Sequence, residues 1–200
     1  MADFDKIAFL AKNAKAFMNK LSTEKKNEVL IAVADNLVKD TDLILAANEI
    51  DVKKGIEGGM HPGIVDRLTL NPQRIIAIAE GVKQVSDLPD PVGILKDEYI
   101  HGNGMSIKKM SVPFGVVGII YESRPNVTAD AWALTFKAGN VVVLKGGSDA
   151  ADSNAIIVDI MHKVLENCGV NPNIIQLLPP KREAANILMN AVQSIELEEK

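Results

Sequence analysis

Apolar residues near the start of the chain recur at helical spacing. Between Ile7 and Leu21 they fall three or four residues apart, on one face of a helix. Ser22 and Thr23 form a capping signal, after which Val29, Val33 and Leu37 repeat the pattern. Two amphipathic helices are therefore predicted to open the protein.

The same spacing continues further along the chain. A third helix is predicted from Asp42 to Ile56, ending near Gly58 and Gly59. A fourth is predicted over residues 71–88, behind a proline at its first turn. Residues 1–90 are thus predicted to be an N-terminal helical part.

The pattern changes between residues 91 and 111. Two extended runs, 92–100 and 105–112, flank His101-Gly102-Asn103-Gly104, and Asn-Gly at such a position is a strong hairpin signal. The G-x-G within this turn is not a dinucleotide fingerprint, because a polar turn precedes it and no helix follows. A long β-ribbon is predicted for residues 91–111.

Residues 112–200 alternate between continuous apolar runs and helical patterns. Unbroken apolar strands joined by helices are typical of a parallel sheet covered on both faces. This part is predicted to be an incomplete doubly wound α/β sheet of βαβαβα type, whose first strand is fully buried. The predicted strands are 114–121, 140–146 and 173–179, and the predicted helices are 127–139, 149–169 and 181–193.

Composition narrows the function classes. With 47% apolar residues, the 200-residue chain has ample material for a packed core. The net charge of -4 and the lack of a basic cluster argue against a nucleic-acid partner. No apolar run is long enough to cross a membrane, and the acidic start is unlike a secretory signal. The single cysteine fits a reducing cytoplasm, where the protein is predicted to reside.

A lone cysteine in an intracellular chain can be a catalytic nucleophile. Cys168 is predicted to end a helix, with Gly169 as the left-handed cap, and the helix dipole there raises a thiol pKa. A structural role is therefore favoured. The histidines His61, His101 and His162 show no metal-ligand spacing, so no metal site is predicted.

The stretch "YESRPNVT" places polar side chains directly behind a predicted strand. Asn126 is predicted to cap a helix beginning near Val127, so that free backbone N–H groups and the Arg124 guanidinium form an anion site. The alternative is an ordinary turn in which Glu122 and Arg124 pair with each other. Local sequence leaves both interpretations open.

The stretch "LKGGSDA" follows the next predicted strand. Gly146 and Gly147 let a ligand approach the backbone, and Lys145 adds a positive charge. The alternative is a flexible loop capped by Ser148 or Asp149.

The segment "VPFGVVGIIYESRPNVTADAWALTFKAGNVVVLKGGSDA" closely resembles the γ-glutamyl phosphate reductase family of the aldehyde dehydrogenase-like superfamily. The similarity extends upstream through "DRLTLNPQRIIAIAEGVKQVSDLPDPVG" and more loosely to both ends. The resemblance implies an aldehyde dehydrogenase-like fold with an oligomerising β-ribbon, and hence a homo-oligomer. It also implies NADPH-dependent reduction of L-glutamate 5-phosphate to L-glutamate 5-semialdehyde and phosphate, a step of L-proline biosynthesis.

Residue roles follow from the same resemblance. Lys145 matches a lysine that contacts the adenine ribose, and Gly146, Gly147 and Ser148 complete the expected cofactor loop. A neutral Ser148, where NAD-preferring relatives often have a glutamate, leaves room for a 2′-phosphate. The expected contacts with the acyl-phosphate end of the substrate are Ser123, Arg124 and Asn126.

Family members extend beyond position 200 into a catalytic domain that carries the nucleophilic cysteine. The chain is therefore expected to be the N-terminal part only, with no catalytic residue of its own and with an unpaired sheet edge that favours self-association. The alternative is a truncated, non-catalytic nucleotide-binding or interaction module.

Overall fold

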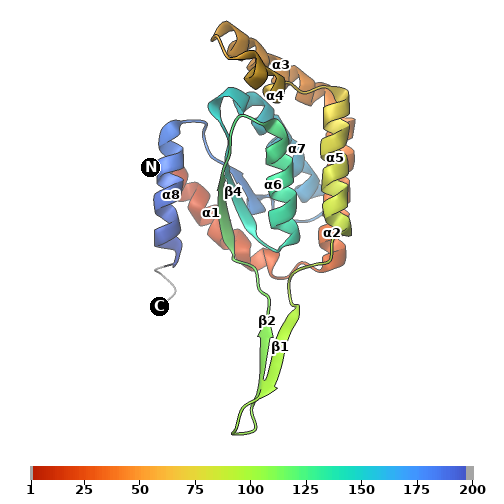
Figure 1. The fold of residues 1–200 in the computed structure, drawn as a ribbon, viewed down its shortest axis with the longest axis vertical. Coiled ribbons are helices and arrows are strands. Elements are labelled where there is room, and N and C mark those ends of the chain that lie inside the picture. Colours follow the sequence, from red (N-terminus) through yellow and green to blue (C-terminus); the bar gives the residue numbers. More distant parts are fainter. Residues whose placement is uncertain (1, 197–200) are drawn as a thin grey trace.

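The computed structural model describes residues 2–196, with side chains from 4 to 190 (Figure 1). Its centre is a parallel sheet of β3 (Val116–Ile120), β4 (Val141–Lys145) and β5 (Ile175–Leu177), in the order β3-β4-β5. Every residue of β4 is buried, because strands flank it on both edges. The predicted α/β architecture with a parallel sheet is confirmed.

The first strand differs from the prediction. Residues 114–121 were expected to be fully buried, but β3 is only partly buried, and Ile120 is 47% exposed. Within the described residues β3 pairs with β4 alone, so its other edge is open. An apolar run identifies a strand, but not whether a neighbour covers both of its edges.

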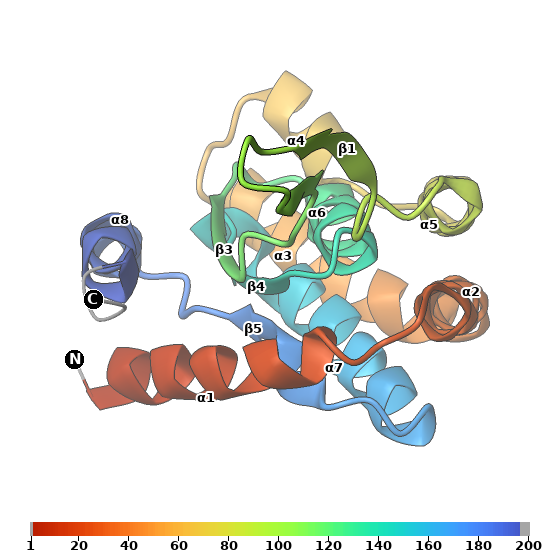
Figure 2. The same ribbon diagram turned by 90° about the horizontal axis from the view of Figure 1, so that it is seen from below.

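Helices cover both faces of the sheet. Figure 2 shows α6 (Pro125–Lys137) and α7 (Ala151–Asn167) on one face, with α1 (Ala2–Met18) and α8 (Arg182–Glu196) on the other. On the second face, α8 packs so closely on β3 that a Cβ at Gly118 would lie 3.0 Å from the Leu188 side chain. On the same face, α1 packs against all three strands, although it lies far from them in the sequence.

Three of the remaining N-terminal helices, α2 (Thr23–Lys39), α3 (Thr41–Glu57) and α5 (Pro72–Asp87), pack on α6 or α7. The short helix α4 (Pro62–Leu68) packs on α3 (Figure 1). The predicted cap at Ser22 is confirmed, since its hydroxyl accepts from the Lys25 N–H at 3.2 Å. The pattern did not predict α4, which is too short to show a helical period.

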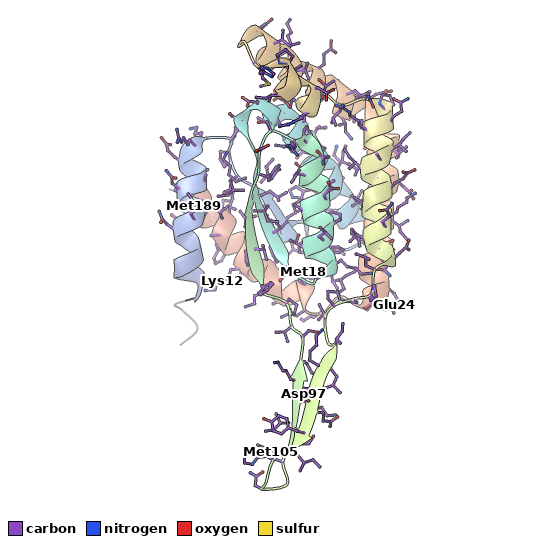
Figure 3. All side chains as sticks on the ribbon, in the orientation of Figure 1. Lys12, Met18, Glu24, Asp97, Met105 and Met189 are labelled. Atoms are coloured by element: carbon purple, nitrogen blue, oxygen red, sulfur yellow. The ribbon has the colours of Figure 1, made fainter. Side chains whose placement is uncertain are left out.

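The predicted β-ribbon is confirmed. Strands β1 (Leu95–Ile100) and β2 (Ser106–Met110) pair antiparallel and project away from the body (Figure 1). Its side chains, Asp97 and Met105 among them, stand outside the core (Figure 3). Exposed apolar residues continue to its root, where Phe114 is 93% exposed.

The division into residues 1–90, 91–111 and 112–200 stays a prediction. One apolar cluster contains buried residues of α2, such as Leu30, together with residues of β4 and α7, such as Leu144 and Ile160. The helical part and the sheet thus share a core.

Candidate functional site

The two polar loops meet at the carboxyl edge of the sheet. Ser123, after β3, donates a hydrogen bond of 3.0 Å from its hydroxyl to the carboxylate of Asp149, after β4. A Cβ placed on Gly147 would lie 2.2 Å from the Ser123 oxygen and 2.8 Å from its backbone nitrogen. Gly147 therefore allows the loops to touch. The topology explains this meeting, because neighbouring parallel strands end at the same edge.

A buried polar chain lies beneath these loops. The Tyr121 and Thr128 hydroxyls are 2.7 Å apart, and Thr128 donates to the Asn154 side-chain oxygen at 2.8 Å. Burial raises the pKa of Tyr121 to about 12. A Cβ at Gly146 would lie 2.3 Å from the Asn154 nitrogen, so this glycine is required by packing.

The start of α6 corrects one prediction. Asn126 does not cap the helix, because α6 already begins at Pro125, with Arg124 at the N-cap and no side-chain capping bond. The fixed φ of proline suits the first helical position, so the helix begins two residues earlier than predicted. Asn126 instead donates to the Asp130 carboxylate at 3.1 Å, one turn along α6.

Arg124 has the partner that the turn interpretation expected. Its Nε lies 3.4 Å from the Glu122 carboxylate, and both side chains are exposed. The single contact leaves other guanidinium donors available. Arg124 and Asn126 also line a hollow of about 390 Å³, which we name the α5–α6 groove. Its other lining residues are Asp66, Arg67, Thr69, Leu70, Arg74, Ala77, Ile78 and Asp130.

A second hollow, the β4–β5 groove, measures about 480 Å³. Gly146 and Gly147 line one side, the start of α7 another, and the segment after β5 a third. The walls are mainly apolar, with a few polar groups such as those of Asn154 and Gln176. Concave, apolar sites with a few polar groups are typical for cofactors and small ligands.

Lys145 and Ser148 lie outside that groove. Lys145 is buried and donates from its ammonium group to the Gly146 carbonyl at 2.7 Å. Ser148 lines a separate hollow of about 460 Å³, the α3–α7 hollow, together with the Lys54–Asp152 ion pair. The structure thus separates the four predicted cofactor residues into three environments.

Asp51 holds the beginning of α7 in place. Its buried carboxylate accepts from the Ser153 N–H at 2.7 Å, from the Ser153 hydroxyl at 2.6 Å and from the Asp152 N–H at 3.2 Å. Burial raises the pKa of Asp51 even though these bonds favour its charged form. Sequence reasoning missed this cap, because it comes from α3, about a hundred positions away.

Comparisons with known proteins agree with this architecture. The model of the aldehyde dehydrogenase family matches residues 1–196. The chain belongs to this family.

Curated relatives are more specific. The chain is similar to gamma-glutamyl phosphate reductase of Pelodictyon phaeoclathratiforme, with 46% identity over 88% of this chain and 42% of the relative. It is 47% identical to the enzyme of that name from Caldanaerobacter subterraneus, over 94% of this chain and 45% of the relative. The crystal structure of gamma-glutamyl phosphate reductase from Thermotoga maritima superposes with a TM-score of 0.89 and 34% identity, over 92% of this chain and 45% of that one. The chain spans less than half the length of these relatives.

Cys168 lies far from the two polar loops that follow β3 and β4. It is the C-cap of α7, while Ala151 at the other end of that helix faces the β4–β5 groove, about 25 Å away along the axis. Burial raises the pKa of the Cys168 thiol, and Gly169 takes the left-handed conformation, as predicted. Burial and this position at the helix end both disfavour the thiolate form.

The histidines serve three separate local structures. His61 accepts from the Gly63 N–H at 3.2 Å, His101 sits in the ribbon turn, and His162 lies 2.9 Å from the Ile175 carbonyl. Within residues 4–190, no group of acidic, histidine or cysteine side chains could hold a metal ion. None of the described helices combines the length and apolarity that crossing a membrane requires.

Proposed function

We propose that the chain forms the nucleotide-binding and acyl-phosphate-binding part of a γ-glutamyl phosphate reductase. The reaction is the NADPH-dependent reduction of L-glutamate 5-phosphate to L-glutamate 5-semialdehyde and phosphate, in L-proline biosynthesis. The observation that carries this proposal is the 46–47% identity, over most of the chain, to relatives that bear this name. Contact between the two polar loops at one sheet edge supports it.

The loop after β3 receives the acyl-phosphate end of the substrate. Arg124 supplies a planar cation with several donors, and Ser123 and Asn126 add a hydroxyl and an amide beside it. Such donors stabilise the negative charge that develops on the carbonyl oxygen during attack. The Glu122 contact is exposed and weak, so a dianionic phosphate competes with it for the guanidinium.

The β4–β5 groove receives the cofactor. Its apolar walls suit an adenine ring, and Gly146 and Gly147 bring the backbone close to the bound ligand. Lys145 and Ser148, which lie outside this groove, are assigned to the adenosine ribose from the family resemblance. A neutral Ser148 tolerates a 2′-phosphate that a carboxylate would repel, which favours NADPH over NADH. When bound, the cofactor supplies the hydride.

The covalent step requires a thiolate other than that of Cys168. A thiolate adds to the acyl carbon, and the C–O bond to phosphate breaks, so that phosphate leaves with the electron pair and a thioester remains. Hydride from a bound cofactor would then reduce the thioester and release the aldehyde and the thiolate. Within the described residues, the side chains bind and orient the substrate, but none supplies this nucleophile.

The protein acts on a small molecule, in the cytoplasm, as a homo-oligomer. Exposed apolar residues along the ribbon and its root, among them Ile100, Val112 and Phe114, support self-association through this element. The acidic net charge disfavours a nucleic-acid partner.

Fluorescence titration of NADPH and NADH against the 200-residue chain tests the proposal. NADPH is expected to bind more tightly than NADH, and Ser148→Glu is expected to remove that preference. Absence of binding by either nucleotide would contradict the assigned groove. Turnover of L-glutamate 5-phosphate by this chain alone would overturn the assignment of the nucleophile to another segment. If a full-length protein binds the nucleotide but never turns over L-glutamate 5-phosphate, the non-catalytic alternative is favoured.

A further inference from the structure

The α5–α6 groove holds charged groups of both signs beside the loop that follows β3. Arg67 and Arg124 line it together with Asp130, at the point where α4, α5 and α6 converge. A phosphate site alone would need only cations. The carboxylate of Asp130 on α6 suits a ligand that also carries a positive charge.

Asp130 is half-buried without a counter-ion. One of its carboxylate oxygens accepts from the Asn126 amide at 3.1 Å, and no lysine or arginine in the described part of the chain forms an ion pair with it. Burial raises the pKa of Asp130, and that cost is relieved when a cation arrives. The other oxygen lies beside Gly81 of α5, where a Cβ would be 3.7 Å away, so no side chain from that position covers it.

Arg67 provides the complementary charge. Its guanidinium is exposed on α4 and has no ion pair or side-chain hydrogen bond among the described residues. Arg74, in contrast, is held by Asp66 at 3.0 Å and by the Thr69 carbonyl at 2.6 Å. Arg67, unlike Arg74, thus has room for a bidentate carboxylate contact.

We propose that the α5–α6 groove binds the α-amino-acid end of the substrate, with Asp130 receiving the ammonium group and Arg67 the α-carboxylate. This inference rests on the proposed function, which places the acyl phosphate at Arg124. The spacing agrees with it. Asn126 and Asp130 are four residues apart on α6, a rise of about 6 Å. The extended chain from the amino nitrogen of a glutamyl group to its side-chain carbonyl carbon has four bonds and spans roughly 5 Å.

The test is a titration of the ¹⁵N-labelled 200-residue chain, followed by NMR. The probes are L-glutamate, glutarate, which lacks the ammonium group, and 4-aminobutyrate, which lacks the α-carboxylate. L-glutamate is expected to shift the signals of Asn126 and Asp130 and to bind more tightly than either analogue. Equal affinities for all three probes would overturn the proposal.

Asp130→Asn preserves the size of the side chain and the bond to Asn126. It is expected to weaken L-glutamate binding by about tenfold or more, because a charged hydrogen bond is lost, and to leave glutarate unaffected. Glu80→Gln, an exposed change on α5 outside the groove, is the matched control and is expected to have no effect. An unchanged L-glutamate affinity in Asp130→Asn would exclude the ammonium contact.

Arg67→Gln gives an independent test, since this exposed side chain packs in no core. It is expected to weaken L-glutamate and glutarate binding but not 4-aminobutyrate binding, and any other order of effects contradicts the assignment.

NADPH titrated into the same samples separates the two proposals. One outcome is that NADPH shifts the Gly146 and Gly147 signals while L-glutamate affinity is unchanged in both variants. The proposed subsite for the α-amino-acid end then fails, and the cofactor assignment stands. If NADPH causes no shift, the proposed function itself fails.

Discussion

The Ser123 hydroxyl and the Asp149 carboxylate are joined by a hydrogen bond of 3.0 Å that links the loop after β3 to the loop after β4. Each residue belongs to a stretch that was interpreted separately in the sequence. Their contact connects the proposed acyl-phosphate site with the proposed cofactor site, so a disturbance in one loop is expected to reach the other.

A double-mutant cycle of Ser123→Ala and Asp149→Ala measures this link. The coupling in the free energy of unfolding is expected to be about 0.5–1.5 kcal/mol, the usual net value of one hydrogen bond. Urea denaturation of the four proteins provides it. Additive effects of the two changes would mean that the bond does not form in solution.

Gly147→Ala is expected to separate the loops. The new methyl group would overlap both the hydroxyl and the backbone nitrogen of Ser123, and the backbone cannot rotate away as a flexible side chain can. A loss of about 1–3 kcal/mol in stability, together with loss of NADPH binding, is expected. Gly102→Ala in the ribbon turn, where nothing lies within 4 Å of the added carbon, is the control and is expected to preserve both properties. Normal NADPH binding by Gly147→Ala would show that the loops tolerate separation.

Tyr121→Phe removes one hydroxyl from the chain that joins β3, α6 and α7. We expect the unfolding free energy to fall by about 1 kcal/mol, because the Thr128 hydroxyl loses a buried partner. Tyr99→Phe removes the same hydroxyl group from an exposed position on the ribbon and is expected to leave the unfolding free energy unchanged. Thermal unfolding followed by circular dichroism compares them, and equal melting temperatures would refute the role of the network.

The buried Lys26–Asp90 ion pair makes stability depend on pH. Burial pushes the pKa of Asp90 up, but hydrogen bonds from the Lys26 ammonium, the Val92 N–H and the Thr23 hydroxyl outweigh it and place the pKa below its ordinary value. Because the folded pKa is lowered, this contribution is full above about pH 4 and is lost as the pH falls through the folded pKa.

The variant Asp90→Asn tests whether this contribution to stability is lost at low pH. The variant leaves the ammonium group of Lys26 buried without a counter-charge, so it is expected to be less stable than the parent by about 3 kcal/mol at pH 7. Urea unfolding of both proteins between pH 7 and pH 2 should show the difference shrinking below about pH 4. A constant difference across that range would mean that Asp90 does not titrate as a paired carboxylate.

Arg124→Ala tests the acyl-phosphate site separately from the cofactor. Binding of acetyl phosphate, measured by calorimetry, is expected to weaken about tenfold or more, because a charge-assisted contact is removed. NADPH affinity is expected to stay normal. Arg182→Ala, which removes an exposed arginine from α8, serves as the control for net charge. If Arg124→Ala weakens NADPH binding instead, the loop after β3 has been assigned to the wrong ligand.

The predictable part of the site is its local part. "YESRPN" and "KGGS" were predicted to be ligand-binding loops because their polar residues and glycines directly follow apolar strands. The cap at Ser22 and the ribbon turn were equally accessible, since each depends on residues within a few positions of one another. The cap assigned to Asn126 was wrong by two residues, because Pro125 takes the first helical position and leaves Arg124 as the N-cap.

Long-range relationships were decided by the tertiary structure alone. The cap of α7 by Asp51, the cover of the sheet by α1 and the groove shared by Arg67 and Asp130 join positions that no local period connects. The partial exposure of β3 belongs to the same class, because it depends on which strand pairs with each edge. By itself, the sequence determined most of the elements and the parallel sheet, since hydrophobic periodicity and turn chemistry act over a few residues. The family was predicted from the resemblance of two long segments. Which side chains share a groove was settled only when packing brought α3–α7 and the two strand ends together, because apolar burial favours compactness without specifying neighbours.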